Sequence, residues 1–152
     1  KGTGVSCIFV THDVNDAILL ANKIAVLDQG KVIQMGTPKE LFDQPLTPAI
    51  ARFFGEINIF NQEEFQQFKI VFEKADFYGI RPEQIQYSMK PDKKSYSAII
   101  IRETFHGLWR KYRLKLFNQI ELDMVVDAQS PVKGREVFIT LPPAHLLVFH
   151  KK

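Results

Sequence analysis

A change of pattern about one third of the way along the chain constrains its fold most strongly. Up to about Gly55, strand-like and helix-like segments alternate, which is typical of α/β proteins. Beyond Asn58, almost every segment has the pattern of a short strand, which is typical of a small barrel or a sandwich. We therefore predict two parts: residues 1–56 form the end of an α/β domain, and residues 57–152 form an all-β barrel domain.

The composition is that of an ordinary globular protein, with 45% hydrophobic and 24% charged residues. Twenty Lys and Arg against 17 Asp and Glu give a net charge of +3, which does not require a polyanionic partner. No apolar run reaches the roughly 18 to 20 residues that span a bilayer, so we expect any link to a membrane to pass through a partner protein. The single cysteine, Cys7, excludes an intramolecular disulfide and a thiolate zinc cluster, and we expect it in a buried strand.

The first part contains signals for a strand, a hairpin and three short helices. Val5–Val10 is a continuous apolar run of the kind that is buried on both faces of a parallel sheet. Asp13 is placed to cap a helix that ends near Asn22. Further predicted elements are a hairpin of residues 24–27 and 31–35 around a turn at 28–30, a capping box in Thr37-Pro38-Lys39-Glu40, and a helix over residues 49–54.

The second part is predicted to contain seven short strands, over residues 69–72, 77–80, 97–105, 109–117, 120–126, 135–141 and 146–149. Apolar and basic residues alternate along 109–117, so one face of that strand should be buried and the other should face solvent. Gly79, Gly107 and Gly134 are expected at turns or bulges that let a small barrel bend.

The tripeptide Thr11-His12-Asp13 stands between the predicted buried strand and the capped helix, where α/β sheets bind ligands. Taken alone, it is equally compatible with a histidine that only forms a hydrogen bond near a helix start. Over a longer stretch, the order of residues from Val10 to Asn58 resembles the end of an ABC ATPase domain. That order includes Ala17, Leu20-Ala21, Ile24 to Leu27, Gly30 to Gln34, Gly36 to Leu41, Pro45 and Phe53-Phe54-Gly55.

The resemblance implies that His12 is the switch histidine of this family, which contacts the γ-phosphate of ATP and the attacking water at a dimer interface. An imidazole suits this role because it can donate a hydrogen bond to a developing phosphoryl charge. One departure is Asp16-Ala17, where the family usually has Glu-Ala. The change is conservative and keeps an acidic residue in the first turn of the helix.

The phosphate-binding machinery of such an ATPase is absent from the chain. It has no Gly-x-x-x-x-Gly-Lys-Ser/Thr loop, no acidic strand end to hold magnesium and no Ser-Gly-Gly signature. ATP and Mg are therefore expected as cofactors of the full-length protein, and we expect neither to bind tightly to this chain. The chain should not hydrolyse ATP alone, and we predict no metal site in it.

The second part resembles the TOBE domain, an OB-like β-barrel appended to the ATPases of importers for polyamines, sulfate, molybdate, iron and sugars. The matching residues are Gly79-Ile80-Arg81-Pro82-Glu83 with Ile85, then Phe105-His106-Gly107, then Gly134 ahead of Val137-Phe138-Ile139. We interpret Pro82 as fixing the turn after a strand, and Arg81 with Glu83 as clasping neighbouring loops. On this interpretation Gly79, Arg81, Pro82, Glu83 and Gly107 are a structural motif and bind no ligand.

The resemblance also implies partners and a location. A second copy of the ATPase subunit would form a homodimer that the barrels help to hold together, and transmembrane permease subunits would couple ATP hydrolysis to solute uptake. The protein would lie on the cytoplasmic, inner face of the cell membrane without inserting into it. Residues 56–61 look most like those of polyamine importers, which favours spermidine or putrescine as the solute.

Two alternatives concern the β domain. It could bind single-stranded nucleic acid through an aromatic and basic strand face, made of Trp109, Arg110, Lys111, Tyr112, Arg113 and Lys115. The same basic residues are also typical of a solvated strand face, and the small net charge argues against nucleic acid as a partner. The domain could instead sense an oxyanion, although the candidate hydroxyl residues are too scattered in the sequence to define a site: Ser95, Ser97, Thr104 and Ser130.

Overall fold

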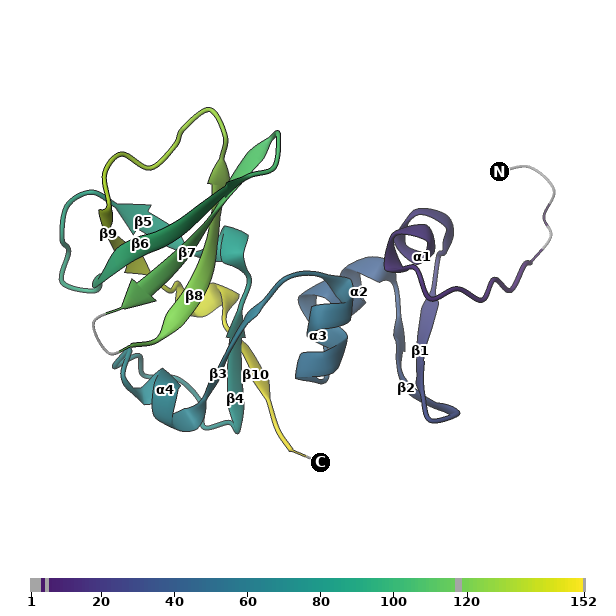
Figure 1. Ribbon diagram of the computed structural model, residues 1–152. Helices are drawn as coiled ribbons and strands as arrows, with labels where there is room; N and C mark the ends of the chain where they lie inside the picture. The colour runs from purple at the N-terminus through teal and green to yellow at the C-terminus, as the bar shows by residue number, and fades with distance from the viewer. Residues whose placement is uncertain (1–3, 5, 117–118, 152) are drawn as a thin grey trace. The chain divides into compact units, whose positions relative to one another are not determined.

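The computed structural model describes residues 4, 6–116 and 119–151 (Figure 1). The chain divides into two compact units, Lys1–Pro45 and Leu46–Lys152. The first is a short α/β unit, in which Leu41 is the one hydrophobic residue that the structure describes as buried. The second is a curled antiparallel β unit that contains the main hydrophobic core.

The first unit contains α1 (Val14–Leu20), β1 (Ile24–Asp28), β2 (Lys31–Gly36) and α2 (Pro38–Asp43). The two strands form the predicted antiparallel hairpin, and the turn residues Gln29 and Gly30 both have positive φ angles, 46° and 76°. Two positive φ angles are the signature of a type I′ turn, which suits the twist of a hairpin. The two predicted helix starts are confirmed as well. Asp13 caps α1, and Thr37 and Glu40 form both hydrogen bonds of a capping box on α2.

The predicted strand at residues 5–10 is wrong for the part of it that the structure describes. Residues 6–10 have no regular secondary structure, and Ile8, Phe9 and Val10 are 95%, 58% and 88% exposed. Cys7 is also exposed, not buried as predicted. A buried strand of a parallel sheet needs hydrogen-bonded neighbours and covering helices. Over the described residues, the sheet of this unit consists of β1 and β2 alone, so the run has no sheet to join. Val5 lies outside the described residues.

In its described residues, the second unit begins with a short helix and continues with eight strands in two antiparallel sheets. The three-stranded sheet has the order β10-β4-β3, and the five-stranded sheet has the order β5-β9-β6-β7-β8. The elements are α3 (Pro48–Phe54), β3 (Asn58–Asn61), α4 (Gln62–Gln66), β4 (Phe77–Ile80), β5 (Gln86–Ser88), β6 (Tyr96–Phe105), β7 (Trp109–Leu116), β8 (Glu121–Asp127), β9 (Glu136–Thr140) and β10 (Leu147–Phe149), with 3₁₀ turns at Pro82–Gln84 and Pro143–His145.

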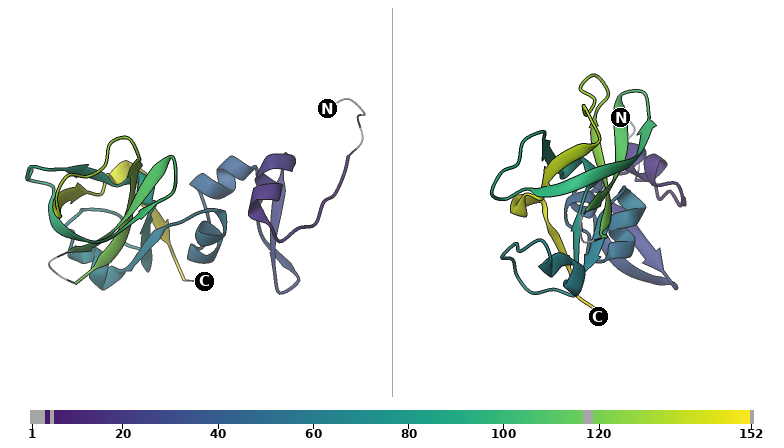
Figure 2. Two further views of the ribbon diagram at one scale, coloured as in Figure 1. Left: turned by 45° about the horizontal axis from the view of Figure 1, so that its top comes forward. Right: turned by 60° about the vertical axis from the view of Figure 1, so that its left-hand side comes forward.

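The two sheets of this unit curl around one core and form a half-barrel (Figure 2). The three-stranded sheet contributes Phe60 and Tyr78, and Phe65 of α4 stacks on Tyr78 with ring centroids 3.8 Å apart. The five-stranded sheet contributes inward side chains from several of its strands, among them Leu114 of β7 and Leu122 of β8. A short N-terminal α/β part followed by a curled β domain is the fold class that the sequence predicts.

Six of the seven predicted strands are present, over residues 77–80, 96–105, 109–116, 121–127, 136–140 and 147–149. The predicted end of one of them, Phe117, lies outside the described residues. The alternation along β7 is confirmed, since Tyr112, Leu114 and Leu116 are buried between partly exposed basic residues.

The predicted strand at 69–72 is wrong, because Lys69 has a φ angle of 49° in a turn after α4. A strand residue cannot adopt that angle. The residues that follow lie in an irregular loop, and Ile70 and Phe72 pack against the core from it.

Candidate functional site

His12 lies in a bend that immediately precedes α1, and its side chain is exposed. The residues on either side hold the bend in place. Thr11 Oγ1 accepts a hydrogen bond from the Asp13 backbone N–H at 2.9 Å, and Asp13 Oδ1 accepts one from the Asn15 N–H at 2.8 Å. The imidazole therefore projects from a fixed loop-to-helix junction into solvent, where a ligand can reach it.

Arg81 follows β4 and is the most deeply buried charged residue that the structure describes, with 4% of its surface exposed. Its Nη1 donates to the backbone carbonyls of Glu56 at 3.1 Å and of Ala51 at 3.4 Å. Ala51 lies in the last turn of α3, where helix carbonyls have no partner within the helix. A buried guanidinium thus satisfies a helix end and ties α3 and the connector after it to the edge of β4.

The other residues of the predicted structural motif have different roles. Pro82 is buried and begins the 3₁₀ turn after β4, as its predicted role in a turn requires. Glu83 lies in the same turn and is exposed. We predicted that Arg81 and Glu83 would both contact neighbouring loops, and Arg81 makes such contacts, with the carbonyls of Ala51 and Glu56. Gly107 has a φ of 77° in the turn between β6 and β7, and this conformation favours glycine.

Gly79 does not lie at a turn or bulge, as the sequence suggested, but inside β4. A side chain there would bring a Cβ atom within 2.7 Å of Ile57 Cδ1 and 3.0 Å of Phe149 Cε2. The residue is therefore a glycine because neighbouring side chains pack directly against its backbone.

Asn58 joins the two sheets of the β unit, a role that the sequence analysis missed. It is 8% exposed, its Oδ1 accepts from the Asp123 N–H at 2.7 Å, and its Nδ2 donates to the Asp123 carbonyl at 2.8 Å. β8 is the last strand of the five-stranded sheet, so these backbone groups point away from β7, and no other strand among the described residues pairs with them. The amide of Asn58 takes the place of that strand and links β3 to β8.

Charged side chains form a network on the outer face next to this link. Lys111 Nζ lies 2.6 Å from Glu56 Oε2 and 3.8 Å from Asp123 Oδ2. Arg113 contacts both Glu121 and Asp123 at 3.2 Å. Burial lowers the pKa of Arg113, but its hydrogen bonds to these two carboxylates outweigh burial, so that the pKa is raised overall.

Two hollows on the surface share Lys111 and Asp123. The larger, here called the outer hollow, has a volume of about 650 Å³ and lies over β6, β7 and β8. The smaller, of about 310 Å³, lies beside the connector that follows α3. The residues that line the outer hollow are Ile101, Arg102, Thr104, His106, Lys111, Arg113, Glu121 and Asp123.

The face suggested for nucleic-acid binding is not available as an aromatic platform. Tyr112 is 1% exposed, its hydroxyl accepts from the Val132 N–H at 3.2 Å, and burial raises its pKa. Trp109 stacks on His106 with ring centroids 3.9 Å apart, and Arg110 forms an ion pair with Glu103. Because most of the basic residues on this strand already have acidic partners, the face offers little free charge to a phosphate backbone.

Neither a metal centre nor a membrane span is found in the described part of the chain. Within residues 4, 6–116 and 119–151, His, Cys, Asp and Glu form no group of three or more that could hold an ion. In the same ranges, no helix has the length and apolar character needed to cross a bilayer.

The fold and these contacts define a small antiparallel β domain, braced by a buried arginine and a buried asparagine, that follows a short α/β unit. Comparison with known proteins agrees with this class. Residues 78–149 match the family model described as TOBE domain.

The chain is also similar to curated ATP-binding proteins of import systems. It is 27% identical over 166 residues to the spermidine/putrescine import ATP-binding protein PotA of Clostridioides difficile (strain 630), a match that covers 100% of this chain and 47% of that protein. It is 32% identical to the protein of the same name from Borrelia garinii subsp. bavariensis, over 98% of this chain and 46% of that protein. It is 34% identical over 118 residues to the sulfate/thiosulfate import ATP-binding protein CysA of Thermosynechococcus vestitus, a match that covers 78% of this chain and 35% of that protein.

The chain thus spans less than half the length of these relatives. Residues 78–149 form a TOBE domain, and the chain is homologous to the C-terminal regions of the ATP-binding subunits of ABC importers.

Proposed function

We propose that this chain is the C-terminal part of a subunit that couples ATP hydrolysis to solute import. Residues 1–56 complete the nucleotide-binding domain, and residues 57–152 form a regulatory and dimerisation domain. The observation that carries the proposal is a similarity to import ATP-binding proteins that extends over both units of the chain, and not over the TOBE domain alone.

The surface of the first unit supports this assignment. Ile8, Val10, Leu19 and Leu20 are each at least 70% exposed. Large exposed groups of apolar side chains mark surfaces that another part of a protein covers. We assign that covering to the rest of the nucleotide-binding domain, whose neighbouring strands would also pair with residues 6–10.

His12 is the residue of this chain that we assign to ATP hydrolysis. Its exposure and its position at the start of a capped helix support a role in contacting the γ-phosphate across a subunit interface. ATP and Mg would be bound by the phosphate-binding loop and acidic residues of the full-length subunit. The described residues of this chain would contribute the imidazole alone.

The transported solute is proposed to be a polyamine, spermidine or putrescine. The names of two relatives described above refer to spermidine and putrescine, and the name of the third refers to sulfate and thiosulfate. Uptake of labelled spermidine and of labelled sulfate should be compared in cells with and without the intact gene. Loss of spermidine uptake alone is the expected result, and loss of sulfate uptake alone would contradict the assignment.

The partners are proposed to be a second copy of the subunit and transmembrane permease subunits, at the inner face of the cell membrane. The gene upstream of Lys1 offers the first test of this account. We expect it to encode a phosphate-binding loop, a Ser-Gly-Gly signature and an acidic strand end, in that order. An upstream region that encodes a different kind of domain in the same reading frame would refute the proposal.

A further inference from the structure

Two loops of the β unit concentrate basic side chains to which the proposed import function gives no role. The loop between β5 and β6 spans residues 89–95, and the loop between β8 and β9 spans residues 128–135. Together they hold five of the 20 Lys and Arg of the chain but only one of its 17 Asp and Glu, Asp92. The five basic residues are all exposed, and they are Lys90, Lys93, Lys94, Lys133 and Arg135.

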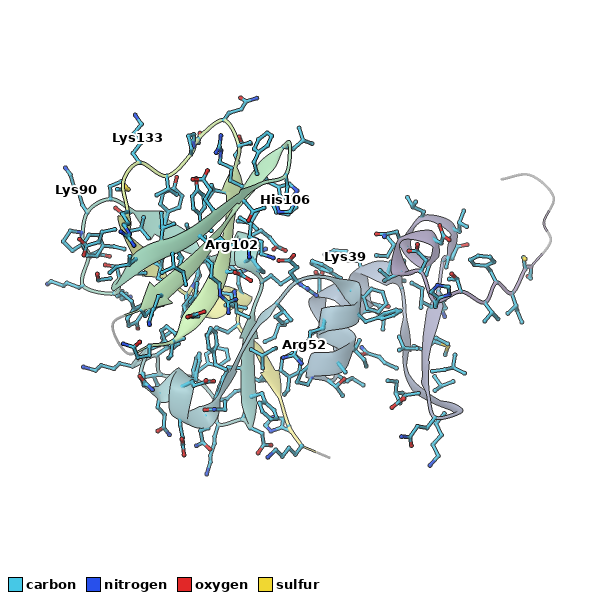
Figure 3. All side chains as sticks on the ribbon, in the orientation of Figure 1. Lys39, Arg52, Lys90, Arg102, His106 and Lys133 are labelled. Carbon is cyan, nitrogen blue, oxygen red and sulfur yellow. The ribbon has the colours of Figure 1, made fainter. Side chains whose placement is uncertain are left out.

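The two loops lie side by side at Gly134. A Cβ atom added to this residue would stand 3.8 Å from Met89 Cε, so the Met89 side chain reaches across to the backbone of the second loop. Lys90 follows Met89, and Lys133 and Arg135 stand on either side of Gly134. Figure 3 shows Lys90 and Lys133 projecting outward from the two loops. Three basic residues therefore stand next to the point of contact between the loops.

Hydrogen bonds hold both loops in place. The Tyr87 hydroxyl, just before the first loop, donates to the Ser130 carbonyl of the second loop at 3.4 Å. The Arg135 carbonyl accepts a hydrogen bond from the Ile100 N–H of β6 at 2.8 Å, which fixes the end of the second loop to the sheet. The basic side chains therefore project from loops whose backbones are tied to the β unit and to each other.

A tight turn in the first loop presents two of the lysines. The Ser95 N–H donates to the Asp92 carbonyl at 3.0 Å, and Ser95 Oγ accepts from the Asp92 N–H at 2.8 Å. Lys93 and Lys94 are the two central residues of this turn. The Asp92 carboxylate accepts a hydrogen bond from the Lys93 N–H at 2.6 Å, so the turn itself engages the one carboxylate of the two loops.

Neighbouring carboxylates do not balance the positive charge of the loops. None of the five basic residues takes part in an ion pair within the described part of the chain. Two further carboxylates stand where the second loop meets its strands. Asp127 accepts a hydrogen bond from the Gln129 N–H at 2.7 Å, and Glu136 accepts one from the Ser97 hydroxyl at 2.9 Å. With these two and Asp92 counted, five positive charges stand against three negative ones, a net charge of +2.

An apolar side chain lies among these charges. Met89 is 46% exposed, although it packs beside Gly134. Methionine is common at surfaces that bind other proteins, because its flexible and polarizable side chain adapts to a partner. The bases of a single nucleic-acid strand would instead need exposed aromatic rings to stack on, and neither loop contains an aromatic residue. An apolar centre beside basic residues therefore fits an acidic protein segment better than a nucleic acid.

We propose that the two loops bind an acidic segment of another protein, one that carries an apolar side chain between its carboxylates. The apolar side chain contacts Met89. The guanidinium of Arg135 holds one carboxylate by two parallel hydrogen bonds, and the ammonium groups of Lys90 and Lys133 attract others. This surface goes beyond the import function proposed above, because it requires only the fold of the β unit, and the import assignment stands or falls independently of it.

Titration of the full chain with a synthetic peptide tests the surface directly. The peptide has equal runs of glutamate on each side of a single leucine, and a second peptide has serine in place of the leucine. At low ionic strength we expect saturable binding of one leucine peptide per chain, with amide shifts at residues 89–95 and 128–135. The leucine peptide should bind about fivefold more tightly than the serine peptide, because the leucine side chain buries apolar surface against Met89.

Two variants separate the charges from the apolar contact. Lys133→Glu should weaken binding of the leucine peptide by about fivefold to tenfold, since it removes one attraction and adds one repulsion. Lys74→Glu is the matched control, because it reverses the charge of an exposed lysine in another loop of the β unit, and it should change the affinity less than about twofold. Met89→Gln leaves the net charge unchanged and should make the two peptides bind equally.

Four results would overturn the proposal. The first is equal affinity of the wild-type chain for the leucine and serine peptides. The second is an equal loss of affinity in the Lys133 and Lys74 variants, which would show general attraction of anions. The third is tighter binding of duplex DNA, or of phosphatidylglycerol vesicles, than of the leucine peptide at the same ionic strength. The fourth is absence of saturable binding at peptide concentrations up to about 1 mM, the range of weak ligands.

Discussion

Replacing Asn58 by alanine tests the link between the two sheets of the β unit. The side chain makes two short hydrogen bonds with the backbone of Asp123, at 2.7 and 2.8 Å, and a longer one of 3.4 Å with the Ile80 carbonyl. Each bond contributes about 1 kcal/mol net, and a buried polar group that loses its partner costs about 1 to 3 kcal/mol. We expect Asn58→Ala to lower the free energy of unfolding by about 2 to 4 kcal/mol, a large part of the 5 to 15 kcal/mol typical of a domain.

Urea unfolding followed by circular dichroism measures this loss, and amide hydrogen exchange locates it. The Asp123 amide should lose its protection in Asn58→Ala before the rest of β8 does, because Asn58 is its acceptor. Asn61→Ala, in the same strand, is the matched control. It removes the cap of α4, should cost about 1 kcal/mol, and should leave the Asp123 amide protected. A loss below about 0.5 kcal/mol in Asn58→Ala, within the range of ordinary surface substitutions, would refute the reasoning.

Three further predictions follow from the structure. Arg81→Ala should destabilise the β unit by about 2 to 4 kcal/mol in urea unfolding, because two backbone carbonyls lose a charged donor, and Arg81→Lys should recover part of that loss. Gly79→Ala should cost about 1 to 3 kcal/mol, since its Cβ would lie 2.7 Å from Ile57; Gly107→Ala meets no atom within 4 Å and should cost only the strain of its positive φ, about 1 kcal/mol. The pKa of Glu40 is lowered, chiefly by the backbone hydrogen bond of the capping box, so α2 should lose stability as the pH falls from 4.5 through that lowered pKa. Amide shifts of α2 should show this transition, and Glu40→Gln should abolish it.

Features that depend on neighbouring residues could be predicted from the sequence. The hairpin turn at Gln29 and Gly30, the cap at Asp13 and the capping box at Thr37 each involve residues at most four positions apart, so their chemistry can be recognised in a short window. The alternation along β7 was equally clear, because the strand is buried on one face.

Features that depend on distant partners could not be predicted. Residues 6–10 have the composition of a buried strand, but burial requires neighbouring strands that the described part of this unit does not supply. Asn58 contacts a residue 65 positions away, and Arg81 contacts carbonyls 25 and 30 positions away. The sequence gives one indication of the role of Asn58, which is that a polar residue stands between Ile57 and Ile59. A polar side chain that packs on a core needs a hydrogen-bond partner, but the sequence does not show which residue supplies it.

The candidate site was predictable to the extent that it rests on resemblance. His12 was singled out because of its family context, and the structure adds that its side chain is exposed at a helix start. The outer hollow could not be predicted from the sequence. A β-bulge between Ile100 and Arg102 changes which residues of β6 lie on the same face as those of β7, and no residue type in the sequence indicates that shift.

The central claim, that this chain completes an import ATPase, is tested most directly by ATP hydrolysis in the full-length subunit assembled with its permease partners. Wild type and His12→Ala should be compared at saturating ATP and Mg, with His106→Ala as a control for loss of an exposed imidazole in the β domain. The account predicts that His12→Ala lowers kcat by at least about a hundredfold, the effect of removing one donor to a developing charge, while His106→Ala hydrolyses ATP normally. Equal rates in wild type and His12→Ala would contradict it.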